Sequence, residues 1–300
     1  MANQDDPARP IRTVGLVARS DLHAAAGLLD EIVEWLERRG VRVLCDDVTA
    51  ALARRAEAEG VTKDALPAQV DLVVVLGGDG TLLGMAGRIA KAGADIPIMG
   101  VNFGSLGFLT ELMLEEVFPA LEAVLEGRAR IDPRLMMRGR VLREDVVLAD
   151  HLVLNDVVVN RGAGSPIIDL SVSVGDTFVT RVRGDGVIVA SPTGSTAYNL
   201  AGGGPILHPD VDALVLTPIA PHTLTNRPVV IPAGAEVRIQ ASIEQAADEA
   251  VASFDGQESV RLARGDLVSV RAARQPLRLV RSATRTYFEV LRQKLKWGER

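Results

Sequence analysis

The sequence predicts an α/β domain with an open, mostly parallel sheet, followed by a mostly antiparallel β domain. The first prediction rests on short apolar runs that alternate with helical patterns along residues 14–125, an order typical of a parallel sheet. The second rests on a change near Asp132, after which short Val-rich runs are separated by Gly, Pro and Asp turns. We therefore expect an α/β domain over residues 1–132, a β-rich domain over 133–284 and a C-terminal helix over 285–300.

The elements of the first domain follow from its apolar patterns. Buried strands are predicted at four short apolar runs, residues 14–18, 41–45, 72–76 and 96–101. Helices are predicted between or after these runs, at residues 22–39, 50–59, 81–91 and 114–125. The run at 72–76 is apolar throughout, so we expect this strand to be covered on both faces.

The second domain is expected to consist of short strands and turns. Strands are predicted at residues 152–160, 170–174, 186–190, 213–216, 229–232 and 237–241. Phe254–Gln257 has the composition of a β-hairpin turn. Residues 287–297 are predicted to form a helix with Tyr287, Phe288, Val290, Leu291, Leu295 and Trp297 on one apolar face. This helix could close the β domain or reach back to the first domain.

Composition excludes several classes of function. The 300 residues carry a formal net charge of −6, which argues against a dedicated nucleic-acid binder. The single cysteine, Cys45, permits no intramolecular disulfide and no cysteine-based zinc site. The acidic N-terminus lacks the pattern of a secretory signal, and no run of 18 apolar residues predicts a membrane-spanning helix. We therefore expect a cytoplasmic protein without a membrane partner.

The run Gly77-Gly78-Asp79-Gly80-Thr81 lies where a buried strand gives way to a helix. Ligands of open α/β sheets bind at the carboxyl ends of strands, and a glycine-rich turn before a helix suits phosphate. Neither the P-loop nor the G-x-G-x-x-G pattern is present. A carboxylate at Asp79 beside phosphates is costly unless it holds a metal or takes a proton. The alternative is a tight turn in which Asp79 caps the next helix.

A second candidate stretch runs from Arg183 through Asp185 to Tyr198. A short strand leads into a turn whose hydroxyl groups can donate to phosphate or ribose oxygens without adding charge. The hydroxyl-bearing residues of this turn are Ser191, Thr193, Ser195 and Thr196. Tyr198 could stack on a base, although a polar β-turn with surface hydroxyls is the structural alternative.

Two further stretches carry polar side chains at strand ends. Asn155 and Asp156 open an apolar strand, and an amide beside a carboxylate can recognise adenine or ribose edges. Prolines fix the path of residues 218–228, where His222 and Arg227 could face phosphate. Taken alone, the Asn-Asp pair is better explained as an ordinary turn, and His222 as a structural histidine.

Taken together, these stretches make the chain similar to the bacterial NAD kinase family. The matching segments occur in the family's order and span most of the chain. They are Gly77–Thr81, Asn102–Leu109, Asn155–Asp156, Gly184–Tyr198, Gly203–Pro205, Pro221–Leu224 with Arg227–Pro228, and Asp255–Gln257. The Gly-Gly-Asp-Gly-Thr turn is shared with diacylglycerol and sphingosine kinases, whereas the Pro192–Tyr198 run with the later segments is highly specific.

The resemblance implies a two-domain fold that binds NAD between the domains and phosphorylates the 2′-hydroxyl of its adenosine ribose, giving NADP. The donor implied is ATP or polyphosphate, with a divalent cation, Mg²⁺, on the donor phosphates and no direct metal ligand from the protein. By resemblance, Asp79 is the catalytic proton acceptor. A homo-oligomer, dimer or tetramer, is also implied, because a neighbouring subunit completes the NAD pocket in this family.

The resemblance carries over residue by residue to the expected site. The donor loop is expected to comprise Gly77, Gly78, Gly80 and Thr81. The residues expected to bind NAD are Asp79, Gly80, Asn155, Asp156, Arg183, Asp185, Thr196, Ala197, Tyr198, Asn199, Leu200, Ala201 and Gln257. Further residues that could line the pocket are Phe108, Ser191 and His222. Asp156 departs from the family's usual Glu by one methylene, and Ser191 replaces a common Thr with its hydroxyl kept.

Three other functions compete with this interpretation. A lipid kinase shares the Asp79 turn, but it leaves the Thr193–Tyr198 run unexplained and no amphipathic membrane-binding helix is evident. A non-catalytic dinucleotide-binding protein is disfavoured because Asp79 and the Asn155–Asp156 pair are both present. A Rossmann dehydrogenase is disfavoured because the turn at residues 18–21 has no glycine fingerprint. The choice of donor, the preference between NAD and NADH, and the number of subunits stay open.

Overall fold

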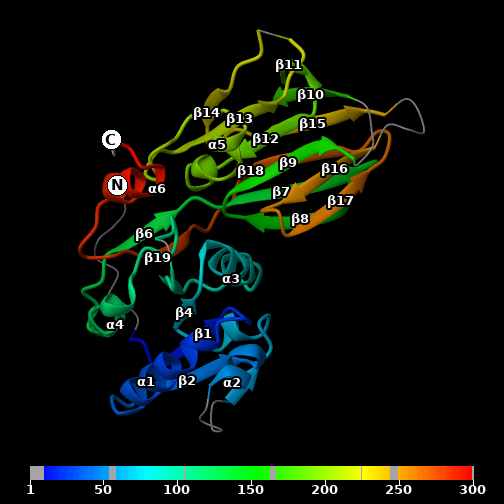
Figure 1. Cartoon of the computed structure of the whole chain (residues 1–300). Helices are drawn as coiled ribbons and strands as arrows, with labels where there is room; N and C mark the ends of the chain where they lie inside the picture. Colours follow the sequence, from blue (N-terminus) through cyan, green and yellow to red (C-terminus); the bar gives the residue numbers. More distant parts are fainter. Residues whose placement is uncertain are drawn as a thin grey trace. The chain divides into compact units, whose positions relative to one another are not determined.

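The computed structural model describes residues 10–53, 59–104, 106–162, 167–223, 225–243 and 249–298 (Figure 1). The chain divides into two compact units. The first unit comprises Met1–Pro133 and Leu277–Arg300, and the second comprises Arg134–Pro276. The predicted boundary at residue 284 therefore differs from the observed one, since residues 277–284 belong to the first unit.

The first unit contains a seven-stranded sheet within the described part of the chain. In sheet order its strands are β3 (Glu59–Val61), β2 (Arg42–Asp46), β1 (Thr13–Ala18), β4 (Leu72–Leu76), β5 (Pro97–Val101), β19 (Leu277–Val280) and β6 (Ile131–Arg134). The pairs from β3 through β19 are parallel. The predicted α/β class and its mostly parallel sheet are confirmed.

Helices cover both faces of this sheet. They are α1 (Ala26–Glu37), α2 (Asp47–Leu52), α3 (Asp79–Lys91) and α4 (Val117–Leu125). The helices α1 and α4 share one apolar cluster with alternate residues of β1 and β4, and the rings of Trp35 and Phe118 lie 5.8 Å apart. The helix α3 packs on the opposite face, where a Cβ at Gly100 of β5 would press against Leu82. All five residues of β4 are buried, as the apolar run predicts.

The helix predicted at residues 50–59 is wrong at both ends. The helix α2 begins at Asp47 because the Asp46 carboxylate accepts the backbone N–H of Thr49, 3.2 Å away, and so caps the first turn. It ends at Leu52, and Glu59 begins β3, which pairs with β2. Residues 54–58 of the prediction lie outside the described residues.

The second unit contains two six-stranded antiparallel sheets in the described part of the chain, which confirms the predicted β class. One sheet has the order β11 (Thr177–Gly184), β10 (Ile168–Val174), β15 (Val237–Ser242), β18 (Leu267–Ala272), β7 (Met137–Arg143) and β8 (Val146–Val153). The other has the order β14 (Val229–Pro232), β13 (Ala213–Ile219), β12 (Gly186–Ala190), β9 (Asp156–Arg161), β16 (Ala250–Phe254) and β17 (Glu258–Leu262).

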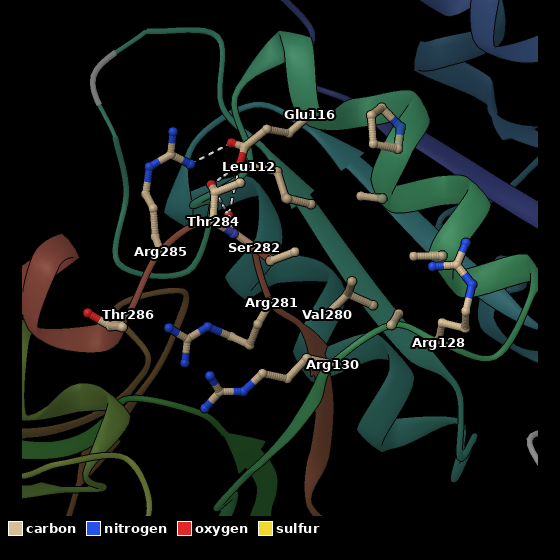
Figure 2. A pocket seen from close by; sticks show the side chains of 15 residues that line it. Leu112, Glu116, Arg128, Arg130, Val280, Arg281, Ser282, Thr284, Arg285 and Thr286 are labelled. Atoms are coloured by element: carbon tan, nitrogen blue, oxygen red, sulfur yellow. Dashed lines mark hydrogen bonds and ion pairs between the residues drawn. The ribbon is translucent and has the colours of Figure 1, made fainter.

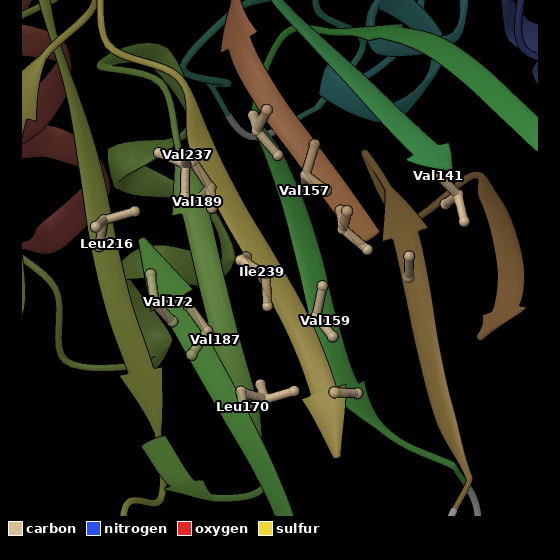
Figure 3. Close-up of a cluster of buried hydrophobic side chains, with 14 of the residues drawn as sticks. Val141, Val157, Val159, Leu170, Val172, Val187, Val189, Leu216, Val237 and Ile239 are labelled. Carbon is tan, nitrogen blue, oxygen red and sulfur yellow. The ribbon is translucent and has the colours of Figure 1, made fainter. Parts of the chain in front are cut away.

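One apolar core joins these two sheets. Alternate residues of β10 and β15, such as Val172 and Ile239, share it with Val159 of β9 and Val187 of β12. Figure 3 shows these side chains gathered between strands of both sheets. The alternation of buried and less buried residues along β10 is the pattern of a strand with one face against a core.

The strand predicted at residues 152–160 is in fact two strands. The chain leaves one sheet at the end of β8, turns at Leu154 and Asn155, and enters the other sheet with β9. The hairpin predicted at Phe254–Gln257 is confirmed, since β16 and β17 pair around it. Its two central residues, Asp255 and Gly256, have φ values of 51° and 65°, as a tight hairpin turn requires.

The C-terminal segment returns to the first unit. The strand β19 pairs with β5, and the helix α6 (Tyr287–Leu295) follows it. Only part of the predicted apolar face of α6 is buried: Val290 and Leu291 are inside, whereas Phe288 and Trp297 are 58% and 53% exposed. The ammonium of Lys294 lies 5.7 Å from the ring centroid of Phe108.

Candidate active site

The glycine-rich turn of the first unit joins the end of β4 to the start of α3. Gly77 is buried, and a Cβ there would lie 3.0 Å from Thr81 Oγ1, so a side chain at this position would fit only if Thr81 shifted. Gly78 and Gly80 have open space where a Cβ would point. The turn therefore leaves room in front of the N-terminus of α3, where free N–H groups favour anions.

The carboxylate of Asp79, the first residue of α3, is fixed by four hydrogen bonds. The backbone N–H groups of Phe108, Leu109 and Thr110 donate to it at 2.8, 3.1 and 2.9 Å. The hydroxyl of Thr110 donates at 2.9 Å. Three of these bonds end on Oδ1 and one, from Phe108, ends on Oδ2. The predicted catalytic carboxylate is thus held by a loop of its own unit.

Gly107 brings this loop against Asp79. A Cβ at Gly107 would overlap Asp79 Oδ1 and Thr110 Oγ1, so only glycine fits here without moving the carboxylate. Asn102 supports the other side of the loop, because its Oδ1 accepts the N–H of Gly104 at 2.7 Å. Phe108, expected to line the pocket, is half-buried next to these residues.

In the second unit, Asp255 holds the predicted Asn-Asp pair. Its carboxylate accepts the backbone N–H groups of Leu154, Asn155 and Asp156 at 2.8, 2.8 and 3.0 Å. The N–H of Asp255 in turn donates to the carbonyl oxygen of Asp156, 2.9 Å away. The hairpin turn and the crossing between the two sheets are therefore locked together.

The buried carboxyl group of Asp156 and the half-buried one of Asp255 meet at this place. Asp156 is 5% exposed, and burial, followed by the charge of Asp255, raises the pKa of Asp156 to about 7. Burial also raises the pKa of Asp255, although the three backbone N–H groups act in the opposite direction. Asp156 can therefore change its charge near neutral pH, which an ordinary aspartate cannot do.

Ser191 connects the hydroxyl-rich turn to the same segment. Its hydroxyl donates to the carbonyl oxygen of Leu154, and its N–H donates to that of Asn155 at 2.9 Å. The Ser191 hydroxyl also accepts the N–H of Gly194 at 3.0 Å. Gly194 lies so close to Asn155 that a Cβ would overlap the Asn155 carbonyl group.

The rest of the hydroxyl-rich stretch is divided between buried and accessible residues. Asn199 is fully buried: its amide donates to Ser195 and Pro205 carbonyl oxygens at 3.0 Å each and accepts from Thr217 at 2.6 Å. Tyr198 is 45% exposed. Thr196, Ala197 and Leu200 are half-buried, and Ala201 is exposed. The side chain of Asn199 thus supports the turn, whereas Tyr198 is accessible to a ligand.

The remaining predicted residues lie at the surface of the second unit. Arg183, His222 and Gln257 are exposed, and the Arg183 carbonyl oxygen accepts the N–H of His222 at 2.8 Å. Asp185 is half-buried and forms an ion pair with Arg161 at 2.7 Å. Hydrogen bonds therefore join Ser191 to Asn155, and Asp255 to both Asn155 and Asp156. Arg183 of β11 is bonded to His222, and Asp185 lies between β11 and β12.

A pocket of about 480 Å³ in the first unit contains none of the predicted site residues. It lies beside α4 and the segment that follows β19, and Figure 2 shows Glu116, Ser282, Thr284 and Arg285 together in it. Burial acts to raise the pKa of Glu116, but hydrogen bonds from Thr284, Arg285, Met113 and Ser282 lower it to about 2.

The pocket borders a buried ion-pair cluster that supports the Asp79 loop. Arg281 is 5% exposed and pairs with Glu111 and Asp132, which are also buried. The N–H of Ser282 donates to the Glu111 carboxylate at 2.7 Å, and Arg285 donates to the Glu111 carbonyl oxygen at 3.0 Å. Because Glu111 follows Thr110, the C-terminal segment holds the end of the loop that binds Asp79.

Sequence reasoning did not identify Asp255, Gly107 or Arg281 as residues of these networks. Asp255 lies in a segment that matches the family, but an Asp-Gly pair is common in hairpin turns, so nothing local indicates its bonds to Leu154–Asp156. Gly107 and Arg281 act through residues distant in the sequence, and no local pattern indicates such contacts.

The described residues contain neither a cluster of metal-ligating side chains nor a helix suited to crossing a membrane. No group of three or more His, Cys, Asp or Glu side chains could hold a metal ion. No helix in the described ranges is long and apolar enough to cross a membrane.

Known proteins match the chain over nearly its whole length. Residues 14–129 match the ATP-NAD kinase N-terminal domain and residues 154–282 match the ATP-NAD kinase C-terminal domain. The NAD kinase of Geobacter metallireducens is 45% identical over 290 residues, covering 97% of this chain and 100% of that protein. The NAD kinase of Solibacter usitatus is 42% identical over 291 residues, covering 97% and 99%.

Solved structures agree with this match. An NAD kinase from Archaeoglobus fulgidus in complex with ATP has a TM-score of 0.73 and 26% identity, covering 94% of this chain and 99% of that chain. Yeast NADH kinase complexed with NADH shares the fold, with a TM-score of 0.86 and 24% identity over 97% of this chain and 89% of that chain. With both family domains matched in order and relatives above 40% identity along its length, the chain belongs to the NAD kinase family.

Proposed function

We propose that this protein transfers a phosphoryl group from ATP or polyphosphate to the 2′-hydroxyl of the adenosine ribose of NAD, producing NADP, with Asp79 as the proton acceptor. The observation that carries the proposal is the position of Asp79 at the start of α3, directly after the carboxyl end of β4. The four hydrogen bonds that fix its carboxylate support a role that depends on orientation.

The hydrogen bonds also favour one oxygen as the acceptor. Within the described part of the chain, Asp79 Oδ1 accepts three hydrogen bonds, whereas Oδ2 accepts one. A carboxylate oxygen has about two lone-pair positions, so Oδ2 has acceptor capacity left for a substrate hydroxyl. In the proposed step the ribose oxygen bonds to the γ-phosphorus, the bond to the β-phosphate oxygen breaks, and the hydroxyl proton goes to Oδ2.

A carboxylate is a weak base for an alcohol, but phosphoryl transfer tolerates this. The transition state is thought to be loose, so the proton leaves late and positioning contributes most of the rate. Mg²⁺ on the donor phosphates would neutralise charge near Asp79. Mg²⁺ usually keeps several waters and binds substrate phosphates, so such a cation would be held chiefly by the phosphates and water.

Residues of both units contribute to NAD recognition in this proposal. Asn155 and Asp156 present an amide and a carboxylate, Tyr198 offers an accessible ring, and Gly80 lies beside the catalytic carboxylate. Relatives named NAD kinase and a structure with bound ATP support the substrates. The homo-oligomer and the cytoplasmic location stay predictions from the resemblance.

The test is NADP formation by the purified protein from NAD and Mg²⁺, with ATP or polyphosphate as donor, read through an NADP-specific dehydrogenase. We expect NADP with at least one donor, and the donor that gives none is thereby excluded. A folded protein that binds NAD but makes no NADP with either donor would refute the proposal and favour a lipid kinase or a regulatory protein. Substituting NADH for NAD in the same assay measures the preference between the two.

A further inference from the structure

The segment Leu154–Asp156 lies where the chain crosses from one sheet of the second unit to the other. Strand β8 ends at Val153 in one sheet, and β9 begins at Asp156 in the other. Backbone N–H groups at such a crossing have no continuous ladder of partners, and buried ones are costly when unpaired. The carboxylate of Asp255 accepts three of them in succession, at 2.8 to 3.0 Å.

The carbonyl groups of the same segment are held from another direction. Ser191 donates to Leu154 and Asn155 carbonyl oxygens, and the N–H of Asp255 donates to that of Asp156. Gly194 packs directly against the Asn155 carbonyl group. The backbone of all three residues is thereby fixed on both its donor and its acceptor sides.

The polar side chains of Asn155 and Asp156, in contrast, are not bonded to the rest of the described chain. Within the described ranges, neither the Asn155 amide nor the Asp156 carboxylate has a hydrogen-bond partner, although Asp156 is only 5% exposed. Asn155 is half-buried, and the mostly buried Asp156 carboxylate is not among the fully buried atoms, so a ligand can reach both side chains. A mostly buried carboxylate without a protein partner is unusual and suits such a contact. The fixed backbone and the unpartnered side chains together indicate a recognition site held ready for its ligand.

A tight turn alone does not require Asp255. Asparagine is equally suited to the left-handed conformation that Asp255 adopts, with φ of 51°, and it carries no charge. Burial disfavours the Asp255 charge, and the neighbouring Asp156 adds a second carboxyl group at the same place. What a carboxylate offers here and asparagine lacks is two acceptor oxygens for three N–H groups.

We propose that Asp255 is a positioning residue for NAD: it fixes the backbone of Leu154–Asp156 so that the Asn155 amide and the Asp156 carboxylate are presented to the dinucleotide. This inference rests on the proposed function and adds to it a residue that does not itself touch NAD. Its action passes through the peptide N–H groups of the segment. Loss of Asp255 is therefore expected to weaken NAD binding while leaving the phosphate donor unaffected.

The charge of Asp255 should also affect how NAD binding depends on pH. A residue that only stabilised the fold would not change this dependence. Asp255 is the charged group that faces Asp156 among the described residues, and its charge contributes to the raised pKa of Asp156. If Asp156 binds NAD as a carboxylate, NAD affinity rises with pH as Asp156 ionises. Replacing Asp255 by asparagine removes the repulsion and moves the midpoint of this rise to lower pH.

The experiment compares Asp255→Asn and Asp255→Ala with a matched control, Asp266→Ala. Asp266 is a buried carboxylate of the second unit that, like Asp255, holds a turn: it accepts the N–H of Ala263 at 2.7 Å and pairs with Arg143. The measurements are the KM values for NAD and ATP, kcat, thermal unfolding, and NAD binding by calorimetry from about pH 5.5 to 8.5.

For Asp255→Ala we expect the KM for NAD to rise about tenfold or more and the KM for ATP to stay within about twofold. Asp255→Asn should give a smaller rise and a midpoint at lower pH, and it carries the test if the alanine variant does not fold. Asp266→Ala should lower the melting temperature without changing either KM. Equal changes in both KM values, an unmoved pH midpoint, or the same NAD defect in Asp266→Ala would overturn the inference. A wild-type protein that binds NAD but forms no NADP would refute the proposed function instead, and the calorimetry would still test Asp255.

Discussion

Each unit of this protein contains an aspartate that accepts hydrogen bonds from three successive backbone N–H groups, but the two aspartates differ in their surroundings. Asp79 begins a helix, takes a fourth hydrogen bond from Thr110 and is partly exposed. Asp255 is also partly exposed, but it sits in a hairpin turn beside the buried carboxyl group of Asp156. The first carboxylate has an oxygen with acceptor capacity left, whereas the second is used to hold a neighbouring segment.

The same arrangement of hydrogen bonds serves two purposes in this protein. A carboxylate bound by consecutive N–H groups is fixed in orientation, and it fixes the loop that donates to it. At Asp79 the fixed orientation of the carboxylate is the useful result, because it is the proposed reacting group. At Asp255 the fixed loop is the useful result, because Asn155 and Asp156 are the proposed contacts. Substitutions in the two regions should therefore change different kinetic constants.

The largest effect is expected for Asp79→Asn. The amide keeps the size of the side chain but cannot accept the ribose proton, so kcat should fall about a thousandfold or more, equivalent to roughly 4 kcal/mol. Binding of NAD, measured by calorimetry, should persist. Asp71→Asn is the matched control, since Asp71 also accepts backbone N–H groups, those of Arg12 and Thr13, at 2.9 and 3.0 Å. Near-normal turnover by Asp79→Asn would show that Asp79 is not the proton acceptor.

The buried ion pairs of Arg281 support the Asp79 loop, and no such ion-pair cluster is described beside Asp255. We expect the loss of these ion pairs to have the next largest effect. Arg281→Met leaves the buried carboxylates of Glu111 and Asp132 without their cation, which should cost about 3 to 5 kcal/mol in the free energy of unfolding. Urea denaturation measures this loss. Arg128→Met removes an exposed ion pair with Glu126 and should cost about 1 kcal/mol or less. Similar losses for both variants would contradict the assigned role of the buried cluster.

Gly107→Ala tests whether the orientation of Asp79 limits the rate. The added Cβ would overlap Asp79 Oδ1 and must displace it, so we expect kcat to fall about a hundredfold with the KM for NAD little changed. At Gly104, in the same loop region, a Cβ would meet only Asn102 Oδ1, at 3.9 Å. Gly104→Ala should therefore remain close to wild type. Equal losses in the two variants would indicate a general disturbance of the loop.

Asp156→Asn tests how much the neighbouring carboxyl groups of Asp156 and Asp255 lower the free energy of unfolding. Folding raises the pKa of Asp156 from 3.8 to about 7, so the folded state binds the proton more tightly and the wild-type protein loses stability as pH rises through this window. Asparagine cannot ionise, so the variant does not lose stability in this way as pH rises. The variant should gain about 2 kcal/mol in unfolding free energy relative to wild type between about pH 5 and pH 8, while its NAD affinity falls. A stability difference that is the same at both pH values would contradict the raised pKa.

The sequence predicted the elements that are formed by an unbroken apolar run with turn residues at its ends. The strands at residues 72–76, 186–190 and 229–232 have the predicted bounds, because each is a short apolar run ended by turn residues. Strand β19 was not predicted, since its place depends on β5, a strand about 180 residues earlier in the chain. The split between β8 and β9 was also missed, because the apolar run continues through the crossing that Asp255 stabilises.

The same distinction applies to the candidate site. Asp79 could be chosen from its neighbours, because a carboxylate in a glycine-rich turn before a helix is unusual. The segment Asp255–Gln257 could be matched to the family, but the role of Asp255 could not be inferred, because an Asp-Gly pair in a hairpin has an ordinary explanation. Asn199 was expected to contact NAD, and only the structure reveals that its side chain is buried and bonded to Ser195, Pro205 and Thr217. Roles that depend on contacts between distant segments leave no local pattern to recognise.

The most direct test of this account is a set of initial rates over a grid of NAD and ATP concentrations for wild type, Asp79→Asn and Asp255→Asn. The account predicts NADP formation by wild type, a loss confined mainly to kcat in Asp79→Asn, and a loss confined mainly to the KM for NAD in Asp255→Asn. If the two variants lose the same constant, or if Asp79→Asn turns over like wild type, the separate roles assigned to the two aspartates are wrong.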